Sequence, residues 1–195
     1  WDCEQFIVTN TDNRVTGTDV PSGLHTALLS SPQYRMDFAD RVQKHLFNGG
    51  ALTPEANSNR WVRLANEVRD GMLAESARWG DYRRDVHQYS AGPYYLYTTN
   101  AYWWPEIDRI RTNYFSTRPD IFLGQLRTAG LFPTLNAPVL SQFGGQVPAG
   151  YLLTMSASNT IYYTTNGNDP RVAFSSAVDD SAMTYADPLA INTAV

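Results

Sequence analysis

The stretch FPTLNAP, residues 132–138, separates two parts of the chain that differ in composition. All Lys and Arg residues except Arg171 precede Pro133, whereas Thr, Ser, Asn, Gly, Ala and Tyr dominate after it. Such a change at a proline-containing stretch is typical of a domain boundary. We therefore predict two domains, over residues 1–132 and 133–195.

The part before this boundary carries the pattern of two long helices. Ser31-Pro32 and Thr53-Pro54 each place an N-cap residue before a proline at the first helical position. Glycines at 49, 50 and 80 are expected to end these helices. Apolar residues recur at helical spacing and predict one buried face on each helix. They are Tyr34, Phe38, Val42 and Leu46 in the first, and Trp61, Leu64, Ala65, Val68 and Met72 in the second.

Two shorter helices are predicted between these helices and the boundary. One covers residues 104–115, and the other begins at Ser116 or Thr117 and ends at Gly130. The two apolar residues that follow Gly130 are expected to fold back onto the last turn, as they commonly do after a glycine cap.

The part after the boundary alternates like a sheet. Five short runs rich in Tyr, Thr and Val are separated by turn sequences; they span residues 137–143, 151–157, 160–165, 182–187 and 188–195. This spacing predicts a small antiparallel β-sandwich, so the fold class is α+β. Because the last run stops at the end of the chain, its pairing partner is expected to be missing and the sandwich to be truncated.

The composition excludes several classes of protein. The chain is 43% hydrophobic and 13% aromatic, which is enough to form a core, and its net charge is −4. The acidic balance argues against a nucleic-acid partner, and no apolar run approaches the roughly 18 residues of a membrane span. The single cysteine, Cys3, excludes an internal disulfide and a cysteine-rich zinc site.

Both halves resemble known bacterial families. FADRVQKHLFNGGALTPE (residues 38–55), AESARWGD (74–81) and the run 114–133 resemble the C-terminal part of the CotH kinase family, large secreted or surface proteins. GGQVPAGYLLTMSA (144–157) and IYYTTNGNDPR (161–171) resemble the fibronectin-like module that often follows it and also ends chitobiases and hexosaminidases. The resemblance implies kinase-like C-lobe helices and an extracellular or cell-surface location.

The same resemblance implies a limited role in phosphoryl transfer. It places the catalytic loop upstream of Trp1 and makes Asp2 a Mg²⁺ ligand, with Glu4 as a weaker one, in a longer parent protein that would use Mg²⁺ and ATP. The opening WDCEQFIV is typical of the middle of a strand, so we expect the chain to be a fragment. One or two carboxylates hold Mg²⁺ poorly without substrate phosphates, so this chain alone is expected to bind no cofactor.

No other catalytic pattern is evident in the sequence. Most carboxylates of the helical part have an arginine three or four residues away, as Glu67 has Arg63. This spacing favours solvated ion pairs over the opposed carboxylates of a glycosidase. No G-x-S-x-G elbow marks a serine nucleophile. We predict no catalytic residue in this chain.

An aromatic cluster is the remaining candidate site. It comprises Tyr94, Tyr95, Tyr97, Tyr102, Trp103 and Trp104. Exposed aromatic side chains stack on sugar rings or anchor protein partners, whereas aromatics between helices commonly fill a core. Of the six, Tyr94, Tyr95, Trp103 and Trp104 are the predicted ligand contacts.

Three roles remain open. The first is a structural, adhesive or carbohydrate-contacting fragment of an extracellular CotH-like protein, whose partner is a surface polysaccharide or a neighbouring chain. The second is a supporting part of a kinase-like phosphotransferase. The third is an assembly protein whose open sheet edge accepts a strand from a neighbour.

Overall fold

The computed structural model describes residues 7–18, 22–88 and 92–192. The chain divides into two compact units, and each unit is built from two separate segments. The first unit comprises Trp1–Arg14 and Lys44–Gln125, and the second comprises Val15–Gln43 and Leu126–Val195. Helices and short antiparallel strands both occur, so the fold class is α+β as predicted. The proposed domain boundary at Pro133 stays a prediction.

The helix α2 (Pro32–Leu46) begins where the sequence predicts and follows a short helix, α1 (Ser22–Leu28). The Ser31 hydroxyl accepts a hydrogen bond from the Tyr34 backbone N–H at 3.3 Å, which caps the first turn. Asn48 and Gly49 follow the helix with φ values of 53° and 77°. The left-handed backbone of these two residues ends the helix.

The helix α3 (Pro54–Trp79) is 26 residues long and also begins as predicted. The Thr53 hydroxyl accepts a hydrogen bond from the Ala56 N–H at 3.4 Å. Ala65 is buried, but Leu64 and Val68 are 43% and 50% exposed. The predicted buried stripe is therefore too wide, because the helices that pack on α3 cover a narrower face.

The break predicted at Ser116 or Thr117 is wrong. One continuous helical segment is formed by α4 (Trp104–Arg109), the π-helical turn η4 (Ile110–Tyr114) and α5 (Phe115–Thr128). The Ser116 hydroxyl donates to the Thr112 carbonyl oxygen at 2.6 Å, and the Thr117 hydroxyl donates to that of Asn113 at 2.7 Å. These hydroxyls bond backward to the preceding turn instead of capping a new helix.

The end of α5 follows the prediction. Gly130 has a φ of 69°, and the Leu131 N–H donates to the Leu126 carbonyl oxygen at 2.9 Å. This is the 6→1 bond of a Schellman cap, which turns the chain back over the helix. Leu131 and Phe132 are both buried beside fully buried Leu126.

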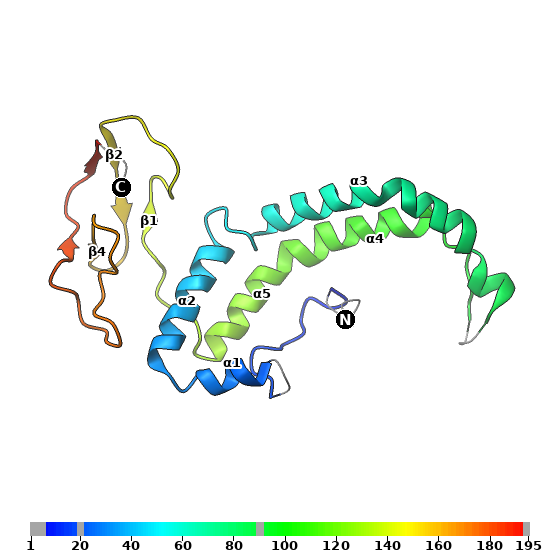
Figure 1. Ribbon diagram of the computed structural model, residues 1–195, viewed down its shortest axis with the longest axis horizontal. Helices are drawn as coiled ribbons and strands as arrows, with labels where there is room; N and C mark the ends of the chain where they lie inside the picture. The colour runs from blue at the N-terminus through cyan, green and yellow to red at the C-terminus, as the bar shows by residue number, and fades with distance from the viewer. Residues whose placement is uncertain (1–6, 19–21, 89–91, 193–195) are drawn as a thin grey trace. The chain divides into compact units, whose positions relative to one another are not determined.

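In the first unit, α3 runs alongside α4 and η4 (Figure 1). The Trp61 indole N–H donates to the Ile107 carbonyl oxygen at 3.3 Å, and the Trp61 ring meets the Phe115 ring edge to face. The buried side chains of this unit are Ala65, Ile107, Ile110, Tyr114 and Leu123. Ala65 of α3 and the buried residues of α4 and η4 come from elements that pack on each other, so this part of the core lies between them.

The N-terminal segment of the first unit is held by side chains of α5. Arg118 donates to the Asn10 carbonyl oxygen at 2.8 Å, and Gln125 donates to that of Thr11 at 2.9 Å. The Asn10 amide in turn donates to the Thr117 hydroxyl at 2.8 Å. Side-chain donors thus satisfy backbone carbonyls that have no strand partner here.

The described residues of the second unit form six short strands, each inside a predicted run. They are β1 (Val139–Leu140), β2 (Tyr151–Leu153), β3 (Met155–Ser156), β4 (Tyr162–Tyr163), β5 (Met183–Thr184) and β6 (Leu189–Ile191). They form three antiparallel pairs, β1 with β3, β2 with β6 and β4 with β5. Among the described residues these pairs are separate two-stranded sheets.

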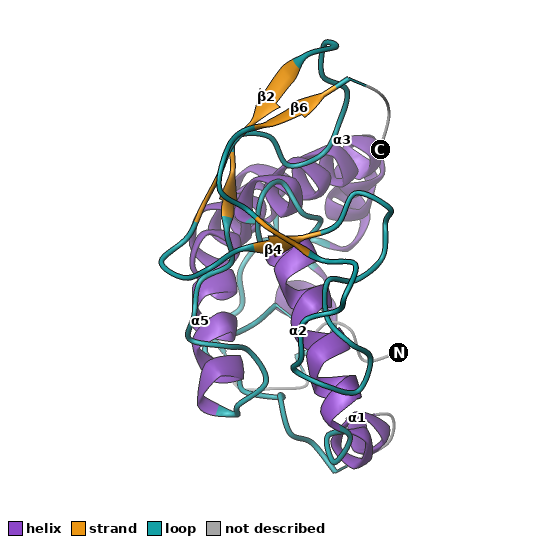
Figure 2. Cartoon of the chain, turned by 90° about the vertical axis from the view of Figure 1, so that its left-hand side faces the viewer, coloured by secondary structure: helices purple, strands orange, loops and turns teal. Residues whose placement is uncertain are grey.

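The last strand is paired, which corrects the expectation of a missing partner. Figure 2 shows β2 beside β6. Tyr151 lies opposite Ile191, and Leu153 lies opposite Leu189. The Gly150 N–H donates to the Ile191 carbonyl oxygen at 2.9 Å and extends the pairing by one residue. The error arose because the partner strand lies about forty residues earlier, beyond the reach of local patterns.

Arg171 ties the strand region to α2 within the second unit. Its guanidinium donates to the carboxylates of Asp169 and Asp40. The hydrogen bond from Arg171 lowers the pKa of Asp169, and the two carboxylates raise the pKa of Arg171. The Phe174 N–H also donates to the Gln33 side-chain oxygen at 2.8 Å.

Candidate functional site

The predicted aromatic contacts lie on consecutive elements of the first unit. Tyr94 and Tyr95 lie in an irregular segment, Trp103 ends the π-helical turn η3 (Thr99–Trp103), and Trp104 begins α4. The Trp103 and Trp104 rings meet at 4.4 Å between centroids.

An open groove of about 380 Å³ lies where the end of α3 meets residues 97–106. Four aromatic rings and two carboxylates dominate its lining; they belong to Trp79, Tyr97, Tyr102, Trp103, Glu75 and Glu106. We call this the aromatic groove. It is the hollow of the first unit in which the aromatic cluster and charged groups meet.

One wall of the aromatic groove is a single face of α3. Met72, Glu75, Ser76 and Trp79 all line it. Their spacing of three, four and seven residues places them on the same side of a helix. The amphipathic pattern of α3 therefore continues to its last turn, where it faces the groove instead of a core.

Two hydrogen bonds join this wall to the opposite one. The Ser76 hydroxyl donates to the Tyr97 carbonyl oxygen, and the Tyr97 N–H donates to the Gly80 carbonyl oxygen, both at 2.8 Å. A Cβ atom on Gly80 would lie 2.4 Å from the carbonyl oxygens of Ser76 and Tyr97. The two chain segments approach this closely because position 80 is glycine.

The opposite wall is built on η3. The Thr98 hydroxyl accepts from the Ala101 N–H at 3.2 Å, and the Tyr102 N–H donates to the Thr98 carbonyl oxygen at 3.0 Å. The Tyr102 ring lies 4.8 Å from that of Tyr97 and 6.0 Å from that of Tyr95. Burial raises the pKa of Tyr102, and the two neighbouring tyrosines add to the rise, so its phenol stays neutral.

The charged groups of the aromatic groove are acidic. Arg109 donates to both carboxylate oxygens of Glu106 at 2.7 Å, and this hydrogen bonding lowers the pKa of Glu106. Glu75 makes no ion pair with any described residue. No Lys, Arg or His is among the described residues that line the groove. The Arg78 guanidinium instead stacks 4.9 Å from the centroid of Trp79.

The aromatic groove brings together only part of the predicted set. Trp103 lines it, while Tyr95 and Trp104 contact rings that line it. Tyr94 instead lies 6.0 Å from the Arg83 guanidinium. Sequence reasoning missed Trp79, Glu75 and Glu106. Gly80 ends α3, as the sequence predicts, and it also allows the close approach of residue 97 that forms the groove.

The predicted Mg²⁺ ligands Asp2 and Glu4 lie outside the described residues. Within residues 7–18, 22–88 and 92–192, no three His, Cys, Asp or Glu side chains are grouped to hold a metal ion. In the same ranges, no helix combines the length and the apolar character of a membrane span.

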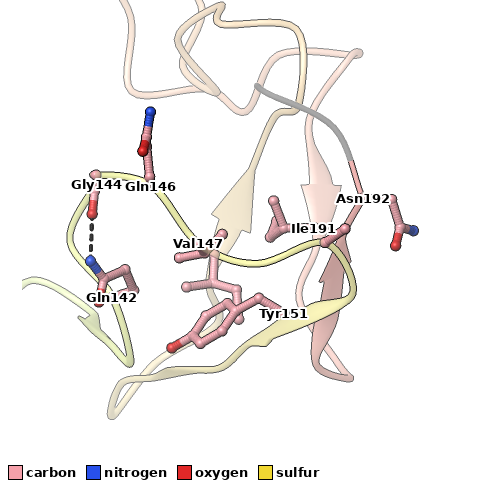
Figure 3. A pocket seen from close by; sticks show the side chains of 10 residues that line it. Gln142, Gly144, Gln146, Val147, Tyr151, Ile191 and Asn192 are labelled. Atoms are coloured by element: carbon pink, nitrogen blue, oxygen red, sulfur yellow. Dashed lines mark hydrogen bonds between the residues drawn. The ribbon is translucent and has the colours of Figure 1, made fainter.

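A second hollow, of about 520 Å³, lies beside β2 and β6 in the second unit (Figure 3). The Gln142 amide donates to the Gly144 carbonyl oxygen at 2.7 Å. Figure 3 shows the Gln146 and Asn192 side chains extending away from each other. The polar side chains of this hollow therefore do not converge on one ligand as they do in typical binding sites.

No protein family, curated protein or solved structure matches this chain. The resemblance to CotH-like proteins and to the fibronectin-like module stays a prediction. Of the two hollows, the aromatic groove has the more specific lining, because aromatic and acidic residues border the same space.

Proposed function

We propose that this chain is a carbohydrate-contacting domain, and that the aromatic groove is its ligand site. The observation that carries the proposal is the gathering of Trp79, Tyr97, Tyr102 and Trp103 along one open groove. Aromatic rings stack on the apolar faces of sugar rings and lose little conformational entropy when they do so.

The exposure of these rings supports binding over core packing. Trp79 is 48% exposed, Tyr97 41% and Tyr102 36%. By contrast, Trp61 is packed against Phe115 and its indole N–H is hydrogen bonded to the backbone. A groove of partly exposed aromatics beside hydroxyl groups, here Thr98 and Thr99, suits a ligand that is both apolar and rich in hydroxyls.

The carboxylates of the aromatic groove support binding over hydrolysis. A glycosidase needs one carboxylic acid whose pKa is raised so that it can donate a proton. Arg109 lowers the pKa of Glu106, which keeps that group ionised. Glu106 is therefore unsuited to be the proton donor, and we propose a carbohydrate contact without bond cleavage, in keeping with a structural or adhesive role.

The finer parts of this proposal come from the family resemblance. The chain would belong to a CotH-like protein at the bacterial surface, with kinase-like helices and a fibronectin-like sandwich. A longer parent protein would use Mg²⁺ and ATP near Asp2 and Glu4. The phosphotransferase and strand-exchange roles stay predictions, and the aromatic groove favours neither.

Glycan-array binding followed by calorimetry on the full chain tests the proposal. Trp79→Ala and Tyr97→Ala are each expected to weaken oligosaccharide binding by about tenfold, since interface aromatics commonly carry that share of the binding energy. Phe174→Ala is the matched control, because Phe174 is an exposed aromatic outside the groove. Failure of every glycan to bind, or equal binding by Trp79→Ala, would overturn the proposal.

A further inference from the structure

We propose that the carbohydrate bound in the aromatic groove is cationic, a polymer of protonated amino sugars. This inference rests on the proposed function and adds the charge of the ligand to it. It follows from two carboxylates, Glu75 and Glu106, that line the groove together with aromatic rings and without a basic side chain among its described lining residues.

Glu75 is the principal contact for the positive charge. It lies four residues before Trp79 on the same face of α3, so its side chain and the indole are neighbours about 5–6 Å apart at their Cβ atoms. A sugar ring stacked on Trp79 thus places a substituent amine within reach of the Glu75 carboxylate. Glutamate side chains are anionic at neutral pH, and this one has no ion pair with a described residue.

Glu106 has a different role. Arg109 holds both of its carboxylate oxygens and offsets part of its charge, so Glu106 is a fixed hydrogen-bond acceptor on the opposite side. Glu106 thus orients a hydroxyl or amine. Glu75 supplies the negative charge that attracts the amine.

The aromatic rings themselves also favour a cation. The Arg78 guanidinium already stacks 4.9 Å from the Trp79 ring centroid, although Arg78 does not line the aromatic groove. Ring faces attract cations through their quadrupole, and the attraction strengthens where water is excluded. A neutral sugar would use the stacking alone, and an anionic sugar would be repelled by both carboxylates.

The test compares short oligomers of glucosamine, N-acetylglucosamine and glucose that share one linkage. Below neutral pH and at low salt, we expect the glucosamine oligomer to bind about tenfold more tightly than either neutral one. Glu75→Gln keeps the shape of the groove and is expected to abolish the preference for the glucosamine oligomer. High salt, about 1 M, is expected to weaken only the cationic oligomer.

Glu67→Gln is the matched control, since Glu67 is an exposed glutamate of the same helix paired with Arg63 outside the aromatic groove. If Glu67→Gln weakens binding as much as Glu75→Gln does, the attraction is general to the acidic surface and the inference is wrong. Equal binding of the three oligomers overturns the cationic ligand but leaves the proposed function intact. Binding of none of the three also overturns the cationic ligand, and the glycan array then decides the proposed function.

Discussion

The Ser76 hydroxyl and the Tyr97 carbonyl oxygen are hydrogen bonded at 2.8 Å across twenty-one residues of chain. Together with the bond from the Tyr97 N–H to Gly80, this contact holds the irregular segment before η3 against the last turn of α3. Both walls of the aromatic groove therefore depend on one short contact between segments.

Ser76→Ala removes the side-chain half of that contact. Because a hydrogen bond of this kind contributes about 1 kcal/mol, we expect the free energy of unfolding to fall by no more than that. We expect faster amide hydrogen exchange at Tyr97 and its neighbours, since their segment loses one of its two anchors. Unchanged exchange in this segment, measured by NMR, would show that the bond does not hold the wall.

Gly80→Ala is expected to be strongly destabilising. The added Cβ meets two carbonyl oxygens at 2.4 Å, and backbone must move to relieve the overlap, at a cost of about 1–3 kcal/mol. Gly71→Ala is the matched control on the same helix, where nothing lies within 4 Å of the added atom. There we expect a gain of about 0.5–1 kcal/mol from helix propensity. Urea unfolding of both variants measures the difference, and equal effects would contradict the close approach.

Arg171→Gln is expected to destabilise the chain in a pH-dependent way. The hydrogen bond from Arg171 lowers the pKa of folded Asp169, so the pair stabilises the fold above the ordinary aspartate pKa of about 4. This stabilisation, about 1 kcal/mol or less after solvent screening, is lost as the pH falls through the pKa of folded Asp169. Because the pKa of Arg171 is raised, its contribution to stability is lost on the alkaline side only above the ordinary pKa of arginine.

Unfolding of the wild type and Arg171→Gln at neutral and strongly acidic pH measures this effect. The two curves are expected to differ at neutral pH and to converge in acid. Arg69→Gln serves as the control, because Arg69 and its partner Asp70 are far more exposed. A difference between wild type and Arg171→Gln that persists in strong acid would mean that the ion pair is not its source.

Phe174 is expected to be replaceable at a gain in stability. It has a φ of 60°, a left-handed backbone conformation that is strained for a bulky residue. It is also 80% exposed, so burial of its side chain does little to offset that strain. Asparagine tolerates this backbone, and Phe174→Asn should therefore raise the free energy of unfolding by about 1 kcal/mol. Asn48→Ala is the converse test at a φ of 53°, and it should lower the melting temperature.

Sequence reasoning succeeded where a structural signal is local. Ser31, Thr53 and Gly130 cap helices through bonds to residues only a few positions away. The helix ends can therefore be predicted from these residue types alone. The signal for the strands is also local, because Tyr and Thr residues favour a half-buried strand whichever partner it pairs with.

Sequence reasoning failed where distant segments decide the outcome. Trp79 and Glu75 belong to a site only because Gly80 lets residue 97 approach them, and no local pattern reveals that contact. Ser116 and Thr117 have the chemistry of N-caps, yet their hydroxyls bond back to an uninterrupted helix. The same side chain can do either, and the packing of the helix selects between them.

The π-helical turn η4 has a consequence for how this region can vary between related sequences. Such a turn accommodates one residue more than an α-helical turn, and each residue rotates a helix by about 100°. Ile107 before η4 and Leu123 beyond it are both buried, because the wide turn absorbs the extra residue and keeps both on the inward face. A one-residue deletion here would let the turn close as α-helix and leave Leu123 facing inward, so η4 is the place in this helix where the loss of one residue is best tolerated.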